Sequence, residues 1–173
     1  MPIRTERLDL VPATLAHLDA EMESPARLGR LLGAEIPASW PPGEYDRSAM
    51  EFFRDRLSES ADAVGWYGWY AVLRPLDGGG RMLIGAGGYF GPPGADGVVE
   101  VGYSIAPEFE RRAFATEMVE ALVSRALRVA GVVRVIAHTK AANTGSIRVL
   151  ERCGFTPAGA GHEPGTVRYE RAV

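Results

Sequence analysis

The sequence predicts a single α+β domain of three layers, with a mixed, mostly antiparallel sheet of about six to seven strands and helices on both faces. Runs of alternating apolar residues mark strands in the middle of the chain. Two of these strands flank a long amphipathic helix, which is the pattern of a parallel crossover. The 173 residues suit one domain with one sizeable core. We therefore expect one domain over residues 1–173.

The stretch 98–130 organises this prediction. Apolar residues alternate along 98–105, as in a strand that stops at Pro107. From Thr116 onward, apolar residues recur at helical spacing. The cationic turn at 110–116 leaves the first backbone N–H groups of that helix without intrahelical partners. Such a helix end attracts anions, phosphate above all.

The other elements follow from the same patterns and from turn residues. Gly85, Gly87 and Gly88 would weaken a strand, so they indicate a bulge, a bend or a close backbone approach. Thr14 and Asn143 are placed as N-caps. Further strands are expected at 3–12, 66–74, 81–90, 132–139 and 167–171, and further helices at 14–23, 25–32, 48–57 and 143–154.

Composition excludes several classes of protein. Hydrophobic residues at 46% and charged residues at 24% are ordinary for a globular chain and argue against disorder. The net charge of -3, without a Lys/Arg-dense tract, argues against a dedicated nucleic-acid binder, although Arg111-Arg112 could form a local basic pocket. The start of the chain lacks a signal-peptide layout, and no apolar run approaches the ~18 residues of a membrane span. We expect a cytoplasmic protein that does not bind membranes.

Cysteine and histidine usage offers no metal centre. Cys153 is the only cysteine, so it cannot form an internal disulfide. His17, His138 and His162 are scattered along the chain and are expected to be structural or exposed. No Ser/His/Asp grouping is visible either. The sequence therefore predicts no metal site.

The cationic turn has the residue types of a phosphate cradle. Ala113 and Ala115 leave room for the backbone to approach a ligand, Arg111 and Arg112 can offset phosphate charge, and Thr116 adds a hydroxyl. On spacing alone, a capped helix with two solvated arginines fits equally well. The glycine-rich motifs of dinucleotide and nucleoside triphosphate sites are absent.

Glu100 is the candidate general base, because a carboxyl group among apolar strand neighbours is expected to have a raised pKa. The alternative is a carboxylate on a solvated face or paired with an arginine. Ser104 lies two strand steps further on, ~13 Å away along an extended strand. Trp40, on a proline-rich loop, could line a substrate opening or be buried. Asn143 and Ser146 could contact a ligand or only cap their helix.

Three motifs together resemble the GCN5-related N-acetyltransferase (GNAT) family over nearly the whole chain. TERLDLVP at residues 5–12 resembles the opening of the branch that acetylates ribosomal-protein N-termini, the RimJ/RimL type. VEVGYSIAPEFERRAFATEMVEAL resembles the family's central strand, pyrophosphate loop and helix. NTGSIRVLERCGF at residues 143–155 resembles its C-terminal motif.

The resemblance implies a V-shaped splay between the central strand and its parallel neighbour, with acetyl-CoA as donor in the V and a primary amine as acceptor. Glu100 would deprotonate the acceptor ammonium, so that the amine attacks the acetyl group directly. An exposed strand edge makes a homodimer possible. The remaining roles are carried onto these positions: Ile105 and Ala106 hold the pantetheine and polarise the thioester, Arg111, Arg112, Ala113, Phe114, Ala115 and Thr116 hold the pyrophosphate, Asn143 and Ser146 contact the pantetheine, and Trp40 and Tyr103 contact the acceptor.

Two departures from the family pattern are visible. The loop usually reads Gln/Arg-x-x-Gly-x-Gly/Ala, whereas Glu110 and Ala113 occupy its first and fourth places here. Ala113 fits if its backbone lies in the ordinary helical region. The tyrosine that some relatives place just after Asn143 is missing, so Ser104 or Tyr103 would protonate the leaving group, or the thiolate leaves unaided. The competing interpretation is a non-catalytic CoA-binding sensor or interaction domain.

Overall fold

The computed structural model describes residues 1–75 and 77–173. Within them, eight strands form one sheet in the order β1-β2-β3-β4-β5-β6-β8-β7. Only β5 and β6 pair in parallel, and all other neighbours are antiparallel. The predicted mixed sheet is confirmed. The strands are β1 Ile3–Arg4, β2 Leu8–Pro12, β3 Gly68–Leu73, β4 Met82–Tyr89, β5 Val98–Ile105, β6 Arg134–Lys140, β7 Thr156–Ala160 and β8 Thr166–Ala172.

The strand count exceeds the predicted six to seven for two local reasons. The single strand expected at 3–12 is wrong, because the chain turns at Thr5, whose N–H donates to Leu8 O at 2.9 Å. The two halves then pair as the hairpin β1–β2. The second addition, β7, is an exposed edge strand whose sequence TPAGA shows no apolar alternation.

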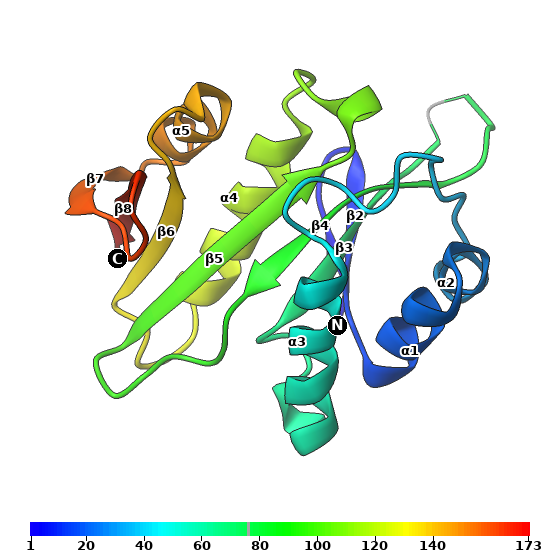
Figure 1. Ribbon diagram of the computed structural model, residues 1–173, viewed down its shortest axis with the longest axis horizontal. Helices are drawn as coiled ribbons and strands as arrows, with labels where there is room; N and C mark the ends of the chain where they lie inside the picture. The colour runs from blue at the N-terminus through cyan, green and yellow to red at the C-terminus, as the bar shows by residue number, and fades with distance from the viewer. Residues whose placement is uncertain (76) are drawn as a thin grey trace.

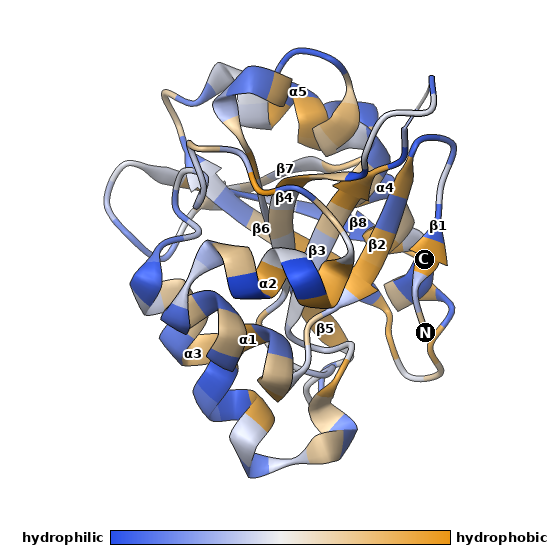
Figure 2. Ribbon diagram, turned by 90° about the vertical axis from the view of Figure 1, so that its right-hand side faces the viewer, coloured by the Kyte–Doolittle hydropathy of each residue, from blue (hydrophilic) through white to orange (hydrophobic). Residues whose placement is uncertain are grey.

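Helices cover both faces of the sheet, as predicted (Figure 1). One face carries α4 (Phe114–Leu127) and α5 (Thr144–Arg152), and the other carries α1 (Leu15–Glu23), α2 (Pro25–Leu32) and α3 (Arg47–Glu59). Short 3-10 turns lie at Ala61–Ala63 and Pro107–Phe109. In Figure 2 the strands carry most of the apolar colour, and the outer sides of α1, α2 and α3 are largely polar. No helix in the described part of the chain is long and apolar enough to span a bilayer.

The central strand β5 is held by α4. Val99, Val101 and Ile105 on one face of β5 are buried in the same core as Met118 and Leu122 of α4. Each such side chain stabilises the fold by about 1.5–3 kcal/mol when it is fully removed from water. The opposite face of β5 carries Glu100, Gly102 and Ser104 because strand side chains alternate. That face is only partly buried.

Three local predictions are confirmed. Thr14 caps α1, accepting from the His17 N–H at 3.3 Å. Asn143 caps α5, where its Oδ1 accepts from the Ser146 N–H at 3.0 Å. At Gly88, which has a positive φ of 133°, a Cβ would lie 1.9 Å from Tyr67 O, so a close backbone approach does require glycine.

The parallel pairing of β5 with β6 stops part-way along both strands. Val98, Val99 and Glu100 pair with residues 134–136, and the two strands then separate. Beyond that point β5 remains paired with β4, and β6 with β8. The separation of β5 and β6 is visible in Figure 1. It leaves one backbone edge of β5 open where side chains of both strands face a shared space.

Candidate active site

A cleft of about 1320 Å³ occupies the space where β5 and β6 separate. Its walls come from β5, β6, the starts of α4 and α5, and the loop around residues 43–45. It brings together most of the residues predicted from the sequence, but Trp40 and Ala106 do not line it. The predicted residues that do are Glu100, Tyr103, Ser104, Ile105, Arg111, Arg112, Ala113, Phe114, Ala115, Thr116, Asn143 and Ser146.

The start of α4 offers unpartnered N–H groups to this cleft. The helix begins at Phe114, two residues earlier than the apolar periodicity predicts, and its N-cap Ala113 makes no side-chain capping bond. The first intrahelical bond runs from Glu117 N–H to Ala113 O at 3.1 Å. The amides of Phe114, Ala115 and Thr116 are therefore free of helical partners, and all three residues line the cleft. This end of α4 has the polarity of an anion site.

The backbone just before α4 differs from the prediction. Ala113 has φ 64° and ψ 14°, in the left-handed region rather than the ordinary helical one, and Arg111 also has a positive φ of 60°. Alanine in this conformation costs roughly 1–2 kcal/mol, because its Cβ approaches the following carbonyl oxygen. The family's glycine at this place would avoid that cost. Small side chains and positive φ values are typical of backbone turns that present N–H groups to anions.

Contacts from the N-terminal hairpin brace this loop. Arg7 donates to the Glu117 carboxylate at 2.8 Å and to Arg112 O at 3.0 Å. Thr5 Oγ1 donates to the same carboxylate at 2.6 Å. Burial acts to raise the pKa of Glu117, but the hydrogen bonds from Thr5 and Arg7 outweigh it and lower that pKa. The Arg112 guanidinium lies 5.2 Å from the centre of the Phe114 ring, which orients it at the mouth of the cleft.

The open edge of β5 supplies further backbone groups. Phe90 N–H donates to Glu100 O at 3.2 Å, and Ala106 N–H donates to Ile84 O at 2.7 Å. In an antiparallel pair, alternate residues face the partner strand, so the backbone groups of Tyr103 and Ile105 face away from β4 and toward the cleft. The Ala106 N–H is therefore already bonded within the sheet, whereas the backbone groups of Ile105 face the cleft.

Glu100 lies at the point where the two strands part, and its side chain is 28% exposed. His138 Nδ1 lies 2.8 Å from Glu100 Oε1, and the His162 ring lies 4.1 Å from the His138 ring, centre to centre. His138 and His162, which are scattered along the sequence, therefore lie next to each other beside Glu100. Donor atoms of all three residues fall within 4.8 Å of one another, so they could coordinate a cation in place of the Glu100–His138 hydrogen bond.

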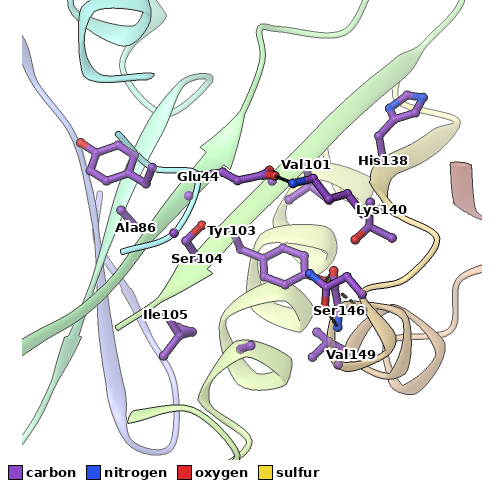
Figure 3. A pocket seen from close by; sticks show the side chains of 18 of the residues that line it. Glu44, Ala86, Val101, Tyr103, Ser104, Ile105, His138, Lys140, Ser146 and Val149 are labelled. Atoms are coloured by element: carbon purple, nitrogen blue, oxygen red, sulfur yellow. Dashed lines mark hydrogen bonds and ion pairs between the residues drawn. The ribbon is translucent and has the colours of Figure 1, made fainter. Parts of the chain in front are cut away.

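Tyr103 and Ser104 point to opposite sides of β5. The Tyr103 hydroxyl lies 2.9 Å from Ser146 Oγ and 3.1 Å from Ser146 O at the start of α5. Burial raises the pKa of Tyr103 to about 12, so its hydroxyl keeps its proton at neutral pH. Ser104 faces the other wall, where a Cβ on Gly43 would lie 3.4 Å from its Oγ. Figure 3 shows these two side chains diverging from β5.

Trp40 is buried beside the cleft and helps to fix its loop. Its indole N–H donates to Glu21 Oε2 at 2.7 Å, while Tyr45 and Tyr70 donate to Glu21 Oε1 at 2.6 Å and 2.7 Å. Glu21 is 5% exposed, and burial raises the pKa of its carboxyl group despite these three hydrogen bonds. Tyr45 belongs to the cleft wall. Of the two alternatives for Trp40, the structure shows the buried one. Tyr45, and not Trp40, lines the cleft.

An ion pair spans the cleft between its two walls. Lys140 Nζ of β6 lies 3.6 Å from Glu44 Oε1 of the loop, and Figure 3 shows the two side chains meeting across the opening. Both side chains are largely exposed, so the pair adds little stability. A ligand entering between the walls could displace it at small cost.

Comparison with known proteins identifies the family. The family model described as "Acetyltransferase (GNAT) domain" matches residues 7–156. The chain belongs to the GNAT acetyltransferase family. It is thus an acyltransferase, and the fold and motif resemblance predicted from sequence is confirmed.

Individual relatives agree with this placement. An uncharacterized N-acetyltransferase, YjdG, of Bacillus subtilis (strain 168) is 27% identical over 153 residues, which cover 88% of each chain. The structure of a ribosomal-protein-S5-alanine acetyltransferase from Vibrio fischeri matches with a TM-score of 0.68 and 15% identity, covering 99% of this chain and 96% of that one. RimL, a ribosomal L7/L12 α-N-protein acetyltransferase solved with coenzyme A, matches with a TM-score of 0.65 and 17% identity, covering 100% and 98%. These two structures show a shared fold.

Sequence reasoning missed three contributors to the cleft. His138 and His162 are 24 positions apart in the printed sequence, and only the pairing of β6 with β8 brings the loop of His162 beside β6. The strand alternation could have placed His138 on the Glu100 side, had the register of the parallel pair been known. Glu44 gave no signal, because its loop has no periodic pattern.

Proposed function

We propose that the protein transfers an acetyl group from acetyl-CoA to a primary amine by direct attack of the neutral amine on the thioester. The observation that carries this proposal is the position of Glu100. Its carboxylate lies in the cleft at the divergence of β5 and β6, on the same cleft as the free amides of α4. An anion site and a base therefore share one cavity, as an acetyl-CoA-dependent transfer to an ammonium group requires.

The donor side is supported by groups of matching chemistry. The amides of 114–116 would hold the pyrophosphate, with Arg111 and Arg112 offsetting its charge. The open backbone edge at Tyr103 and Ile105 would hydrogen-bond the pantetheine and polarise the acetyl carbonyl. Asn143 and Ser146 line the same side at the start of α5. The likeness to RimL, which was solved with coenzyme A, agrees with this assignment.

The acceptor side is supported by the Glu100–His138 pair. Glu100 would remove a proton from the acceptor ammonium, and the 2.8 Å contact from His138 Nδ1 would hold its carboxylate in place. The nitrogen lone pair then attacks the carbonyl carbon and the C–S bond breaks. Tyr103, whose hydroxyl is protonated at neutral pH and faces the α5 side of the cleft, is the better candidate to protonate the departing thiolate than Ser104, which faces the other wall.

The test is acetyl-CoA-dependent acetylation of a panel of small primary amines by the unmodified protein, Glu100→Gln and the matched control Glu59→Gln. Glu59 ends α3 on the exposed surface, away from the cleft. We expect Glu100→Gln to lower kcat by ~10²-fold or more, the size typical of losing a general base, with the control unaffected. Unchanged turnover in Glu100→Gln would remove this residue from the reaction. Binding of acetyl-CoA without acetylation of any amine would favour the non-catalytic sensor instead.

A further inference from the structure

An aromatic wall stands beside Glu100. It consists of Phe52 and Phe53 of α3, Tyr67 before β3, and Phe90 after β4. The Phe52 ring lies at the centre of the group. Its centre is 5.6 Å from that of Phe53, 6.0 Å from that of Tyr67 and 6.3 Å from that of Phe90. These separations are typical of aromatic rings in contact. The four rings therefore form one continuous apolar surface.

Two of the four rings are exposed, Tyr67 is half-buried and Phe53 is buried. Phe90 is 51% exposed and Phe52 is 36% exposed, whereas Phe53 is buried. Phe90 and Phe53 both line the cleft that contains Glu100. An exposed phenylalanine side chain does not contribute the hydrophobic stabilisation that a buried one provides. Adjacent exposed apolar side chains are often the place where a ligand or partner binds. Of the two exposed rings, Phe90 lines the cleft, and Phe52 adjoins it outside the cleft lining.

Phe90 and Glu100 are cross-strand neighbours. The Phe90 N–H donates to Glu100 O at 3.2 Å, next to the paired Tyr89 and Val101. Residues opposed in this way present their side chains on the same face of the sheet, with Cα atoms about 5.5 Å apart. The ring also lies over Gly102, where a Cβ would come within 3.1 Å of it. An apolar ring and the general base of the proposed function therefore stand side by side.

Charge is divided along the cleft in a way that fits a cationic acceptor at this end. Arg111 and Arg112 of the loop before α4, with Arg148 and Arg152 of α5, line one side, where Glu110 is the one acidic neighbour in that loop. At the aromatic end the cleft contains the carboxylate of Glu100 and that of Glu44, which is paired with Lys140 at 3.6 Å. A ligand that satisfied both the Glu100 carboxylate and the exposed Phe90 ring would carry an ammonium group next to a large apolar group.

We propose that the acceptor is a primary amine whose carbon next to the nitrogen carries a ring-sized apolar substituent, which packs on Phe90 and Phe52. This inference rests on the proposed function, and it adds the acceptor class. A peptide N-terminus that begins with phenylalanine and a free arylalkylamine share this chemistry.

The test compares L-phenylalaninamide with L-serinamide, which share the ammonium and the amide and differ in the side chain. Steady-state acetylation is expected to give a kcat/KM at least ~10-fold higher for L-phenylalaninamide, as hydrophobic pockets discriminate by one to two orders of magnitude. Phe90→Ala should bring the ratio toward one. Leu31→Ala, at an exposed leucine on α2, should leave it unchanged. Equal kcat/KM values for the two amides with the unmodified protein would overturn the inference and leave the proposed function intact.

A binding measurement separates the two claims. Calorimetric titration of L-phenylalaninamide in the presence of CoA should show saturable binding that Phe90→Ala weakens, whether or not turnover occurs. Binding without acetylation would support the acceptor class while contradicting the proposed function. If neither amide binds or reacts, the inference is overturned, and the panel of small primary amines then decides the proposed function separately. If Phe90→Ala instead converted a dimer to a monomer in sedimentation, a second copy of the chain would be the partner of this surface, and the inference would be wrong.

Discussion

Replacing Ala113 with glycine, in the strained backbone before α4, should raise the stability of the protein, whereas an alanine-to-glycine substitution usually lowers it. Replacing alanine with glycine usually destabilises a protein because glycine loses more conformational freedom on folding. Ala113, however, has φ 64° and ψ 14°, a left-handed conformation that glycine adopts without strain. Ala113→Gly should therefore stabilise the fold, and it also restores the glycine that the family loop usually carries.

The magnitude follows from two opposing terms. Relief of the left-handed strain contributes roughly 1–2 kcal/mol. The extra entropy that glycine loses on folding costs about 0.5–1 kcal/mol. At the middle of both ranges the net gain in the free energy of unfolding is about 0.75 kcal/mol, and the extremes span about 0 to 1.5 kcal/mol. In a chain of 150–250 residues, each 1 kcal/mol shifts Tm by roughly 2–4 °C. At the mid-range value, the expected rise in Tm is about 1.5–3 °C.

Thermal unfolding followed by circular dichroism measures this shift. The matched control is Ala121→Gly, the same substitution within α4, where it should lower the free energy of unfolding by about 1 kcal/mol. The two variants should therefore move Tm in opposite directions. A lower Tm for Ala113→Gly would refute the argument, since it would mean that the left-handed conformation carries no cost that glycine can remove.

Three further predictions follow from the contacts around the cleft. His138→Asn should lower kcat by roughly 10- to 100-fold in the acetylation assay while acetyl-CoA affinity stays constant, because Glu100 loses the partner that orients it; an unchanged kcat would contradict this role. Glu21→Gln should lower the free energy of unfolding in urea by about 1–3 kcal/mol, because an amide cannot accept from three buried donors; an unchanged midpoint would rule that out. The pKa of Glu117 is lower in the folded state than in the unfolded chain, where it is about 4.3. The ionised carboxylate therefore adds to the free energy of unfolding above that pH, and this contribution is lost as pH falls through the folded-state pKa. Between pH 6 and pH 3, the free energy of unfolding in urea should therefore fall less for Glu117→Gln than for the unmodified protein. If the two plots of this free energy against pH are parallel, the ionisation of Glu117 is not linked to folding.

Elements with strong local patterns were predictable from the sequence. The alternation along 98–105 and the helical spacing after it gave β5 and α4, and the caps Thr14 and Asn143 fixed the starts of α1 and α5. These features depend on residues close in sequence, which is why they can be read from it. The turn that splits the first predicted strand is held by hydrogen bonds between Thr5 and Leu8 and gave no periodic signal.

The site was predictable only where a motif covered it. The anion-binding end of α4 and Glu100 lie within one continuous stretch, and both line the cleft. The partners of Glu100 come from other strands, and their approach depends on the register of β5, β6 and β8, which alternation alone does not set. The positive φ of Ala113 is likewise a product of the whole loop, since alanine rarely adopts it.

Binding of acetyl-CoA at the start of α4 is the claim on which the rest of the account depends. Isothermal titration calorimetry with acetyl-CoA tests it directly, using the unmodified protein, Arg112→Glu in the cleft and Arg30→Glu on the exposed surface of α2. We expect saturable binding that weakens roughly tenfold or more in Arg112→Glu, because a carboxylate then faces the phosphates, and that is unchanged in Arg30→Glu. Absence of binding to the unmodified protein, or equal affinities for all three, would contradict the placement of the donor in this cleft.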